Sequence, residues 1–311
     1  MSCCTPEGPK QATGVTRASM SAGVRRADID LVPIPAGDFR MGNDGPDAIA
    51  GDGEGPARRV TLSAYAIAPA TVTNAAFAAF VRATRYVTEA EQEGFSFVFY
   101  LQVPEEARRT ARRVVSGLPW WMPIEHACWQ RPEGAGSHIY DRPQHPVVHV
   151  SWNDAQAYCA WAGVQLPTEA QWEKAARGGL EGRRFAWGDD LIVAGRTGCN
   201  VWRGDFPQAP EPGWLPAPVA ARSGEPNAYG LYNVCGNVWE WCRDAFDPAY
   251  HTATACHDPI GVAATGVRAL RGGSFLCHDS YCFRYRTSAR HANTPSSTAS
   301  NIGFRVAASM P

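Results

Sequence analysis

The sequence lacks the features typical of secreted, membrane-spanning and nucleic-acid-binding proteins. Its first residues contain no apolar stretch typical of a secretory signal, and no run approaches the roughly 18 apolar residues of a membrane span. The 29 basic and 30 acidic residues give a formal net charge of -1, so no basic field favours nucleic acid or an anionic membrane. We therefore expect a cytoplasmic protein.

Charged residues are also scarce, at 19% of the chain, whereas turn-forming and aromatic residues are common. The 311 residues include 30 Gly, 24 Pro and 11 Trp, which indicates many turns held by aromatic packing. Ten cysteines occur without a Cys-x-x-Cys motif. In a chain without a signal segment, they favour cytosolic thiols or metal ligands over a disulfide framework.

We expect a flexible N-terminal tail over residues 1–28 and one domain over residues 29–311, because no internal repeat or linker divides the chain after the tail. Capping residues predict three helices, beginning after Thr73, Ser151 and Thr168. The last 130 or so residues show only the patterns of short strands and loops.

Cys277 and Cys282 are the most informative residues, set among Gly, Ser, His, Tyr and Arg. Their five-residue offset corresponds to about 140° around a helix and to opposite faces of a strand. The two thiols can therefore meet only if the backbone between them is irregular. If they meet, they can form a disulfide, a redox pair or a two-thiolate site for a soft metal such as Cu(I).

Several motifs make the chain recognisable. They are His145–Ala155, Leu166–Glu173, Gly236–Trp241, the segment with Cys277 and Cys282, and Asn293–Arg305. With these stretches the chain resembles the formylglycine-generating enzymes, also called sulfatase-modifying factors, over nearly its whole length beyond the tail. The resemblance implies a single-domain α+β fold of the formylglycine-generating-enzyme type, related to C-type lectins and low in regular secondary structure.

The resemblance also implies an activity. It is that of a copper-dependent, O2-using oxidase, which converts the cysteine of a Cys-x-Pro-x-Arg motif in an unfolded sulfatase to Cα-formylglycine. Cys277 and Cys282 would bind Cu(I) and leave room for the substrate sulfur, while Ser274, Tyr281 and Trp239 match positions that line the family's active site. The alternatives are a structural disulfide or unrelated thiols for the pair, and core packing for Trp239.

Calcium is the second metal that the resemblance implies. The amide of Asn233, the carbonyls of Gly236 and Val238 and the carboxylate of Glu240 match one family site, and these are oxygen ligands that suit Ca²⁺. The alternative is a hydrogen-bonded turn with Glu240 in a salt bridge.

A second calcium site of the family would begin at Asn200 and Val201. Its downstream half has Pro212 where an acidic residue is expected, so Glu211 could substitute only through a rerouted loop.

Other polar and thiol side chains are expected to be structural. His278 is expected to be exposed or to act behind the metal ligands, and Arg284, Arg286 and Arg290 to form ion pairs. Family members of the secretory pathway have disulfides that Cys159 and Cys235 cannot form here, because their partner positions hold other residues. The remaining thiols outside the tail are expected to pack in the core: Cys128, Cys199, Cys242 and Cys256.

The tail repeats the opening of the substrate motif, because Cys4–Gly8 reads Cys-Thr-Pro-Glu-Gly, with Gly in place of Arg. One hypothesis is that it visits the substrate groove as a weak pseudo-substrate, and another is that Cys3 and Cys4 help to load copper. The alternative is a chance similarity in a disordered tail. Candidates for lining the groove are Trp120, Trp121 and Phe97.

Three other functions stay open. A non-catalytic, lectin-like peptide-binding paralogue would fit the fold, but the resemblance implies that such paralogues lack the cysteine pair. An iron-dependent sulfoxide synthase would need a helical domain with a His cluster, whereas the eight histidines are scattered. A disulfide oxidoreductase would be favoured by Cys-x-x-Cys, which is absent. The expected partners of a monomeric enzyme are an unfolded sulfatase chain and O2.

Overall fold

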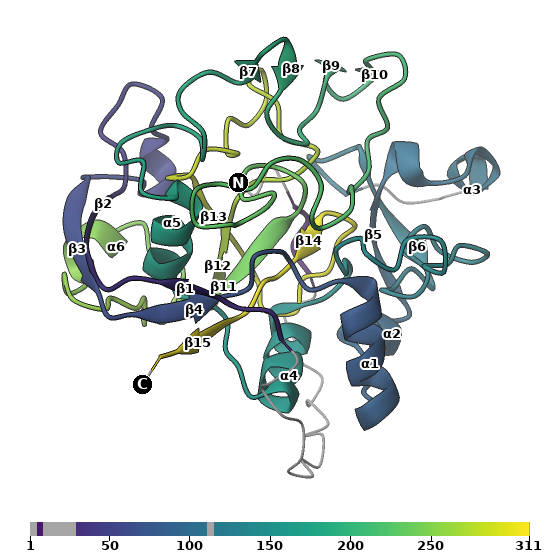
Figure 1. Ribbon diagram of the computed structural model, residues 1–311. Helices are drawn as coiled ribbons and strands as arrows, with labels where there is room; N and C mark the ends of the chain where they lie inside the picture. Colours follow the sequence, from purple (N-terminus) through teal and green to yellow (C-terminus); the bar gives the residue numbers. More distant parts are fainter. Residues whose placement is uncertain (1–4, 9–28, 111–114, 311) are drawn as a thin grey trace.

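A four-stranded sheet forms the centre of the protein, for which a computed structural model describes residues 5–8, 29–110 and 115–310 (Figure 1). Its strand order is β13-β12-β11-β14, and only the β11–β14 pair is parallel. The strands are β11 (Trp239–Ala245), β12 (Arg268–Arg271), β13 (Arg290–Asn293) and β14 (Ile302–Gly303). All four lie within the stretch in which short strands and loops but no long helix were predicted; the four-residue helix α6 (Tyr250–Ala253) in this stretch was not predicted.

Smaller sheets surround the central one. A three-stranded sheet has the order β1-β4-β15, and the other strands form two-stranded ribbons. The strands of the small sheet are β1 (Val32–Ile34), β4 (Tyr65–Ile67) and β15 (Ala307–Ser309). The ribbons pair β2 (Gly37–Met41) with β3 (Arg58–Leu62), β5 (Phe95–Phe99) with β6 (Trp121–Glu125), β7 (Ile192–Val193) with β8 (Arg196–Thr197), and β9 (Gly204–Asp205) with β10 (Ala209–Pro210).

Three helices begin where their capping residues predict. Thr73, Ser151 and Thr168 each accept a hydrogen bond from a backbone N–H of the first turn, at the starts of α1 (Asn74–Thr84), α4 (Trp152–Ala162) and α5 (Glu169–Arg177). Helix α5 packs on β11 and β12 and on the β2–β3 ribbon (Figure 1). The shorter helices are α2 (Glu89–Glu93), α3 (Glu105–Thr110) and α6 (Tyr250–Ala253), with 3-10 turns η2 (Ala50–Asp52) and η3 (Tyr100–Gln102).

The core contains buried ion pairs as well as aromatic side chains. A buried charge is tolerated when it is paired and hydrogen-bonded. Four fully buried arginines meet this condition, in the pairs Arg271–Glu173, Arg286–Glu54, Arg290–Glu169 and Arg305–Glu240. Arg284 forms a fifth pair with Asp52. The prediction that Arg284, Arg286 and Arg290 form ion pairs is therefore confirmed.

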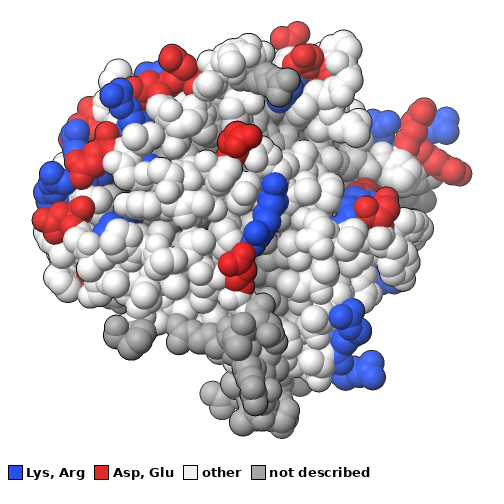
Figure 2. Space-filling view, in the orientation of Figure 1, with Lys and Arg blue, Asp and Glu red and all other residues white. Residues whose placement is uncertain are grey.

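The surface agrees with the balanced composition. Figure 2 shows charged side chains of both signs gathered at the edge over β2 and β3, while most of this face is uncharged. Within the described part of the chain, no helix has the length and apolar character needed to span a bilayer.

The expected N-terminal tail lies mostly outside the described residues, and so do Cys3 and Cys4. The four described residues, Thr5–Gly8, differ from the expectation of a separate flexible tail. Thr5, Pro6 and Gly8 are buried against the domain, and only Glu7 is exposed.

Candidate active site

Two glycines at the end of β12 start the loop that carries the cysteine pair. Gly272 and Gly273 both have left-handed backbone, with φ of 92° and 74°, which side chains rarely adopt. A Cβ on Gly273 would lie 2.8 Å from both the Arg284 carbonyl oxygen and the Tyr285 Cα. The first residues of the loop thus contact its last residues, and residues 274–283 form a closed loop between them.

Tight turns within this loop bring the two cysteines together. Cys277 N–H donates to the Ser274 carbonyl (2.9 Å), and Cys282 N–H donates to the His278 carbonyl (2.8 Å). The two sulfur atoms lie 3.3 Å apart, and the residues are 1% and 4% exposed. A disulfide bond is about 2.05 Å long, so the two sulfurs are in contact without being bonded to each other.

Polar groups on one side of the sulfurs are fixed by a short network. The Ser274 backbone N–H donates to Cys277 Sγ at 3.4 Å, an interaction that favours a thiolate. The Ser274 hydroxyl oxygen accepts from Asn301 Nδ2 (3.0 Å) and from Leu276 N–H (3.3 Å). Ser274 therefore lies beside Cys277, and it is held there by Asn301, a residue outside the loop that the sequence analysis did not single out.

Aromatic rings close the other side. The Tyr281 ring stacks on Phe206 with centroids 4.6 Å apart, and the edge of Trp120 meets it at 5.1 Å. A narrow cavity lies between these rings and the sulfurs, lined by Trp120, Trp121, Phe206, Ser274, Leu276, Cys277, Tyr281 and Cys282. Trp120 and Trp121 were predicted near this site, whereas Phe206 comes from a loop that gave no signal in the sequence. Phe97 lies on β5 and does not line the cavity.

Trp239 and His291 lie behind the residues that line the cavity. Trp239 does not line the cavity, and its indole ring lies against the His291 imidazole at 5.2 Å. Its backbone N–H donates to the Asn301 carbonyl (2.8 Å), so it is tied to the same residue as Ser274. Burial, and then the nearby Arg284, lower the pKa of His291 to about 4, so this imidazole is neutral at pH 7. His278 is partly exposed and lies beside Asp279, as expected.

The donor set at the cysteine pair fits a soft metal ion. Two adjacent thiols in a buried, mostly apolar setting offer sulfur ligands, and sulfur is the donor that Cu(I) prefers. Within the described part of the chain no three His, Cys, Asp or Glu side chains form a cluster that could bind a metal. A metal at Cys277 and Cys282 would therefore have two sulfur ligands from the described part of the chain.

The predicted calcium ligand Glu240 forms an ion pair with Arg305. Its two carboxylate oxygens accept from Arg305 (2.5 and 2.7 Å), and one also accepts from Trp172 Nε1 (2.7 Å). The guanidinium balances the carboxylate charge that a Ca²⁺ ion would use. This geometry does not fit a calcium site built on Glu240, and it favours the alternative, a turn with Glu240 in a salt bridge.

The other predicted calcium residues lie in one place. Asn200 forms a bridge to Gly236, and the Asn233 amide nitrogen donates to the Ala220 and Ala221 carbonyls (3.2 and 3.0 Å). Val201 and Val238 are buried apolar residues near them, and Glu211 is exposed.

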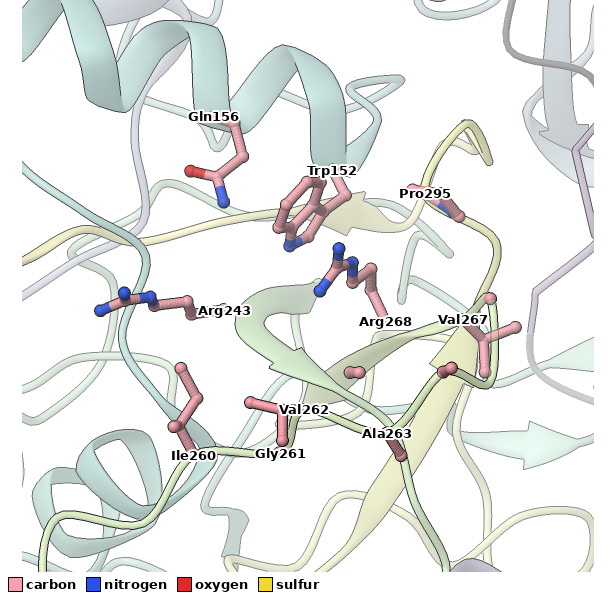
Figure 3. A pocket seen from close by; sticks show the side chains of 13 residues that line it. Trp152, Gln156, Arg243, Ile260, Gly261, Val262, Ala263, Val267, Arg268 and Pro295 are labelled. Atoms are coloured by element: carbon pink, nitrogen blue, oxygen red, sulfur yellow. The ribbon is translucent and has the colours of Figure 1, made fainter.

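A separate pocket lies away from the sulfurs. Trp152, Arg243, Ile260 and Arg268 line it, and the Arg268 guanidinium stacks on the Trp152 ring at 4.0 Å (Figure 3). None of the predicted site residues lines this pocket. The predicted site residues Ser274, Cys277, Tyr281 and Cys282 line the narrow cavity instead.

The remaining described cysteines differ in their exposure. Cys128, Cys159, Cys235 and Cys242 are buried thiols, and burial raises the pKa of Cys235 to about 12. Cys199 is half-buried. The expectation that Cys256 packs in the core is wrong, because this residue is exposed at the turn beside Arg58.

A family model and several known proteins match this chain over about nine-tenths of its length. The family described as the sulfatase-modifying factor enzyme 1-like domain matches residues 17–310. The formylglycine-generating enzyme of Thermomonospora curvata is 53% identical over 89% of this chain and 93% of its own. The inactive Cα-formylglycine-generating enzyme 2 of Bos taurus is 43% identical over 90% and 88%. PvdO from Pseudomonas aeruginosa shares the fold, with a TM-score of 0.63 and 24% identity over 91% of this chain and 95% of its own.

Proposed function

The chain belongs to the sulfatase-modifying factor family and is a formylglycine-generating enzyme, and on this premise we propose a copper-dependent, O2-using oxidase. Its substrate is the cysteine of a Cys-x-Pro-x-Arg motif in an unfolded sulfatase segment. The product is Cα-formylglycine. We place the enzyme in the cytoplasm, because a reducing compartment keeps thiol ligands available. We also propose that it acts as a monomer.

One observation carries the proposal: two buried sulfur atoms lie 3.3 Å apart, unbonded, at the wall of a small aromatic cavity. When bound there, Cu(I) would supply the affinity for a third sulfur and the reactivity toward O2 that the side chains of the protein lack. In the proposed reaction the substrate cysteine loses two hydrogens, one from Cβ and one from sulfur, and O2 takes them up together with two more electrons and protons from a thiol reductant to give two water molecules. Water then hydrolyses the resulting thioaldehyde, which releases H2S and leaves the aldehyde.

The residues of the chain prepare the site for this chemistry. The Ser274 N–H at Cys277 Sγ favours the thiolate form, which is the form that binds metal. Asn301 donates to the Ser274 hydroxyl oxygen and so leaves the hydroxyl proton directed elsewhere, available to a sulfur or oxygen group in the cavity. The rings of Trp120, Phe206 and Tyr281 exclude water, which protects reactive species from side reactions.

The alternative is a non-catalytic peptide-binding paralogue, to which the inactive relative at 43% identity draws attention. The resemblance implies that such paralogues lack the cysteine pair. Here the pair is present and its sulfurs are in contact. This observation favours the oxidase.

Incubation of a Cys-Thr-Pro-Ser-Arg peptide with the enzyme, Cu(I), a thiol reductant and O2 should convert the thiol to an aldehyde, read by mass spectrometry. Removal of copper with a Cu(I) chelator, or of O2, should each stop the conversion, and Cu(I) should restore it after chelation. A peptide that binds but stays unchanged under all conditions would favour the paralogue. Conversion that persists in the chelator would overturn the copper part of the proposal.

A further inference from the structure

The pocket between α4 and the start of β12 has the size of a binding site for a small molecule (Figure 3). Its volume is about 480 Å³, within the range of about 300–1,000 Å³ that is typical of such sites. It lies at the Arg268 end of β12, whereas the loop with the cysteine pair follows the other end of this strand. The pocket and the narrow cavity share no lining residue, so they are distinct sites.

The Arg268 guanidinium is held in this pocket by stacking. It lies on the Trp152 ring at 4.0 Å, and that ring is itself fixed, because its Nε1 donates to the Cys242 carbonyl (2.9 Å). Figure 3 shows Trp152 extending from α4 and Arg268 from β12 to meet it. Among the residues that the structure describes, the Arg268 guanidinium donates no hydrogen bond and forms no ion pair. Its N–H donors are therefore available to a ligand.

The charge of Arg268 is only weakly compensated. Asp244 lies nearby, but its two carboxylate oxygens accept from the Gly261 N–H (2.7 Å) and the Glu169 N–H (2.9 Å). Burial, and then the charge of Glu169, raise the pKa of Asp244, which weakens it as a counter-charge. Burial lowers the pKa of Arg268, and Asp244 offsets only part of this effect. A bound anion would supply the compensation that the protein leaves out.

Two further polar side chains line the same pocket. Arg243, on β11, is exposed and donates to Gln165 Oε1 (3.2 Å), so its other donors stay available. Gln156 extends from α4 toward the pocket (Figure 3). No aspartate or glutamate of the described residues lines it. The pocket therefore favours an anion, and the planar fork of arginine matches the oxygens of carboxylates and phosphates.

An apolar loop forms another wall of the pocket. The apolar lining residues of this loop are Ile260, Val262, Ala263 and Val267. The loop is held at both ends, because the Ala245 N–H donates to the Gly261 carbonyl (2.9 Å) and the Phe246 N–H to the Val267 carbonyl (3.1 Å). Val262 is nevertheless 81% exposed. The pocket thus combines an anchored apolar surface with a cation that lacks a close partner.

We propose that this pocket binds a small organic oxyanion, a carboxylate or phosphate carried on an apolar body. The oxyanion lies at Arg268, and the apolar body lies against the loop of residues 260–267. Arg243 adds a second positive charge. The site goes beyond the proposed oxidase function and does not depend on the cysteine pair.

The test is a calorimetric titration of the full-length protein at pH 7 and low ionic strength, with benzoate and phenyl phosphate in separate experiments. We expect a Kd of about 1 mM or below for at least one of them, and the tighter probe identifies the oxyanion. Benzamide keeps the shape of benzoate without its charge, and inorganic phosphate lacks the apolar body. Each should bind about fivefold more weakly than its parent probe, or not at all.

Variants locate the bound probe. Arg268→Gln should raise Kd about tenfold, because a charged hydrogen-bond donor is lost. Arg82→Gln is the matched control, since it removes the same charge from an exposed position on α1, and it should leave Kd unchanged. Cys277→Ser should also bind the probes as the wild type does, whatever its effect on oxidation.

A second pair of variants leaves the interior of the protein untouched. Val262→Glu places a negative charge at an exposed residue of the pocket and should raise Kd about fivefold, whereas Val262→Gln, of the same size, should change it little. Benzamide bound as tightly as benzoate would overturn the inference. The same Kd in wild type, Arg268→Gln and Val262→Glu would overturn it too, and so would the absence of binding by both probes at about 10 mM.

Discussion

Replacement of either Cys277 or Cys282 by serine should abolish formylglycine formation in the peptide assay. Serine keeps the size of the side chain but replaces a soft sulfur by a hard oxygen, which Cu(I) does not favour. Loss of a residue behind the ligands of a metal commonly costs about 10–100-fold in affinity or activity. Loss of one of only two ligands should cost more, and we expect kcat/KM to fall by about a thousandfold or beyond, roughly 4 kcal/mol of transition-state stabilisation.

Cys159→Ser provides the control for this experiment. Cys159 is also a buried thiol, at 2% exposure, but it lies in α4 and outside the cavity. Its variant should keep both activity and tight Cu(I) binding, measured by competition with a Cu(I) chelator, whereas each variant of the pair should lose tight binding. Activity near that of the wild type in Cys277→Ser or Cys282→Ser would exclude the two-thiolate site.

Local signals predicted the parts of the fold that depend on local contacts. Thr73, Ser151 and Thr168 each bond to a backbone group three residues on, so the sequence alone contains both partners. The same signal exists at Thr88 and Glu91, which form a capping box at α2. That helix was not predicted, because its five residues are too few to show an apolar periodicity.

The meeting of Cys277 and Cys282 depends on contacts that the sequence does not reveal. Their spacing left a disulfide, a redox pair and a metal site open. The two thiols meet because Gly273 lacks a side chain, which lets the start of the loop touch the backbone at Arg284 and Tyr285. A pair of glycines in a sequence predicts a turn, but it does not predict which distant backbone segment the turn will contact.

Glu240 shows the same limit for a charged residue. A motif match assigned its carboxylate to calcium, but the sequence could not show that Arg305, 65 residues further on, reaches the same carboxylate. Asn293 and Ser297 likewise bond to Thr5 and Gly8, almost 290 residues away in the chain. Contacts between residues so far apart in the sequence determine the site, and local sequence patterns do not predict them.

Glu173→Gln should destabilise the protein by about 3–5 kcal/mol at pH 7, because it leaves buried guanidinium groups without their carboxylate. The Glu173 side chain is fully buried, and it accepts from Arg177 (2.8 Å), Arg271 and the Gly42 N–H (2.7 Å). Burial alone would raise its pKa, but Arg177 and Arg271 prevail and lower it from 4.5 to about 2. A shift of this size corresponds to about 3 kcal/mol, in agreement with the first figure.

The depressed pKa fixes the sign of the pH dependence. The stabilisation by Glu173 is fully present above the unfolded value of 4.5 and is lost as the pH falls toward 2, where the folded-state carboxylate takes up its proton. The difference between wild type and Glu173→Gln in urea unfolding should therefore be constant from pH 7 to 5 and shrink below 4.5. Glu181→Gln, at the exposed pair with Arg59, should cost at most about 1 kcal/mol. Equal costs for the two variants, or a Glu173 difference that persists unchanged to pH 3, would show that the buried network does not hold α5 to β12 as described.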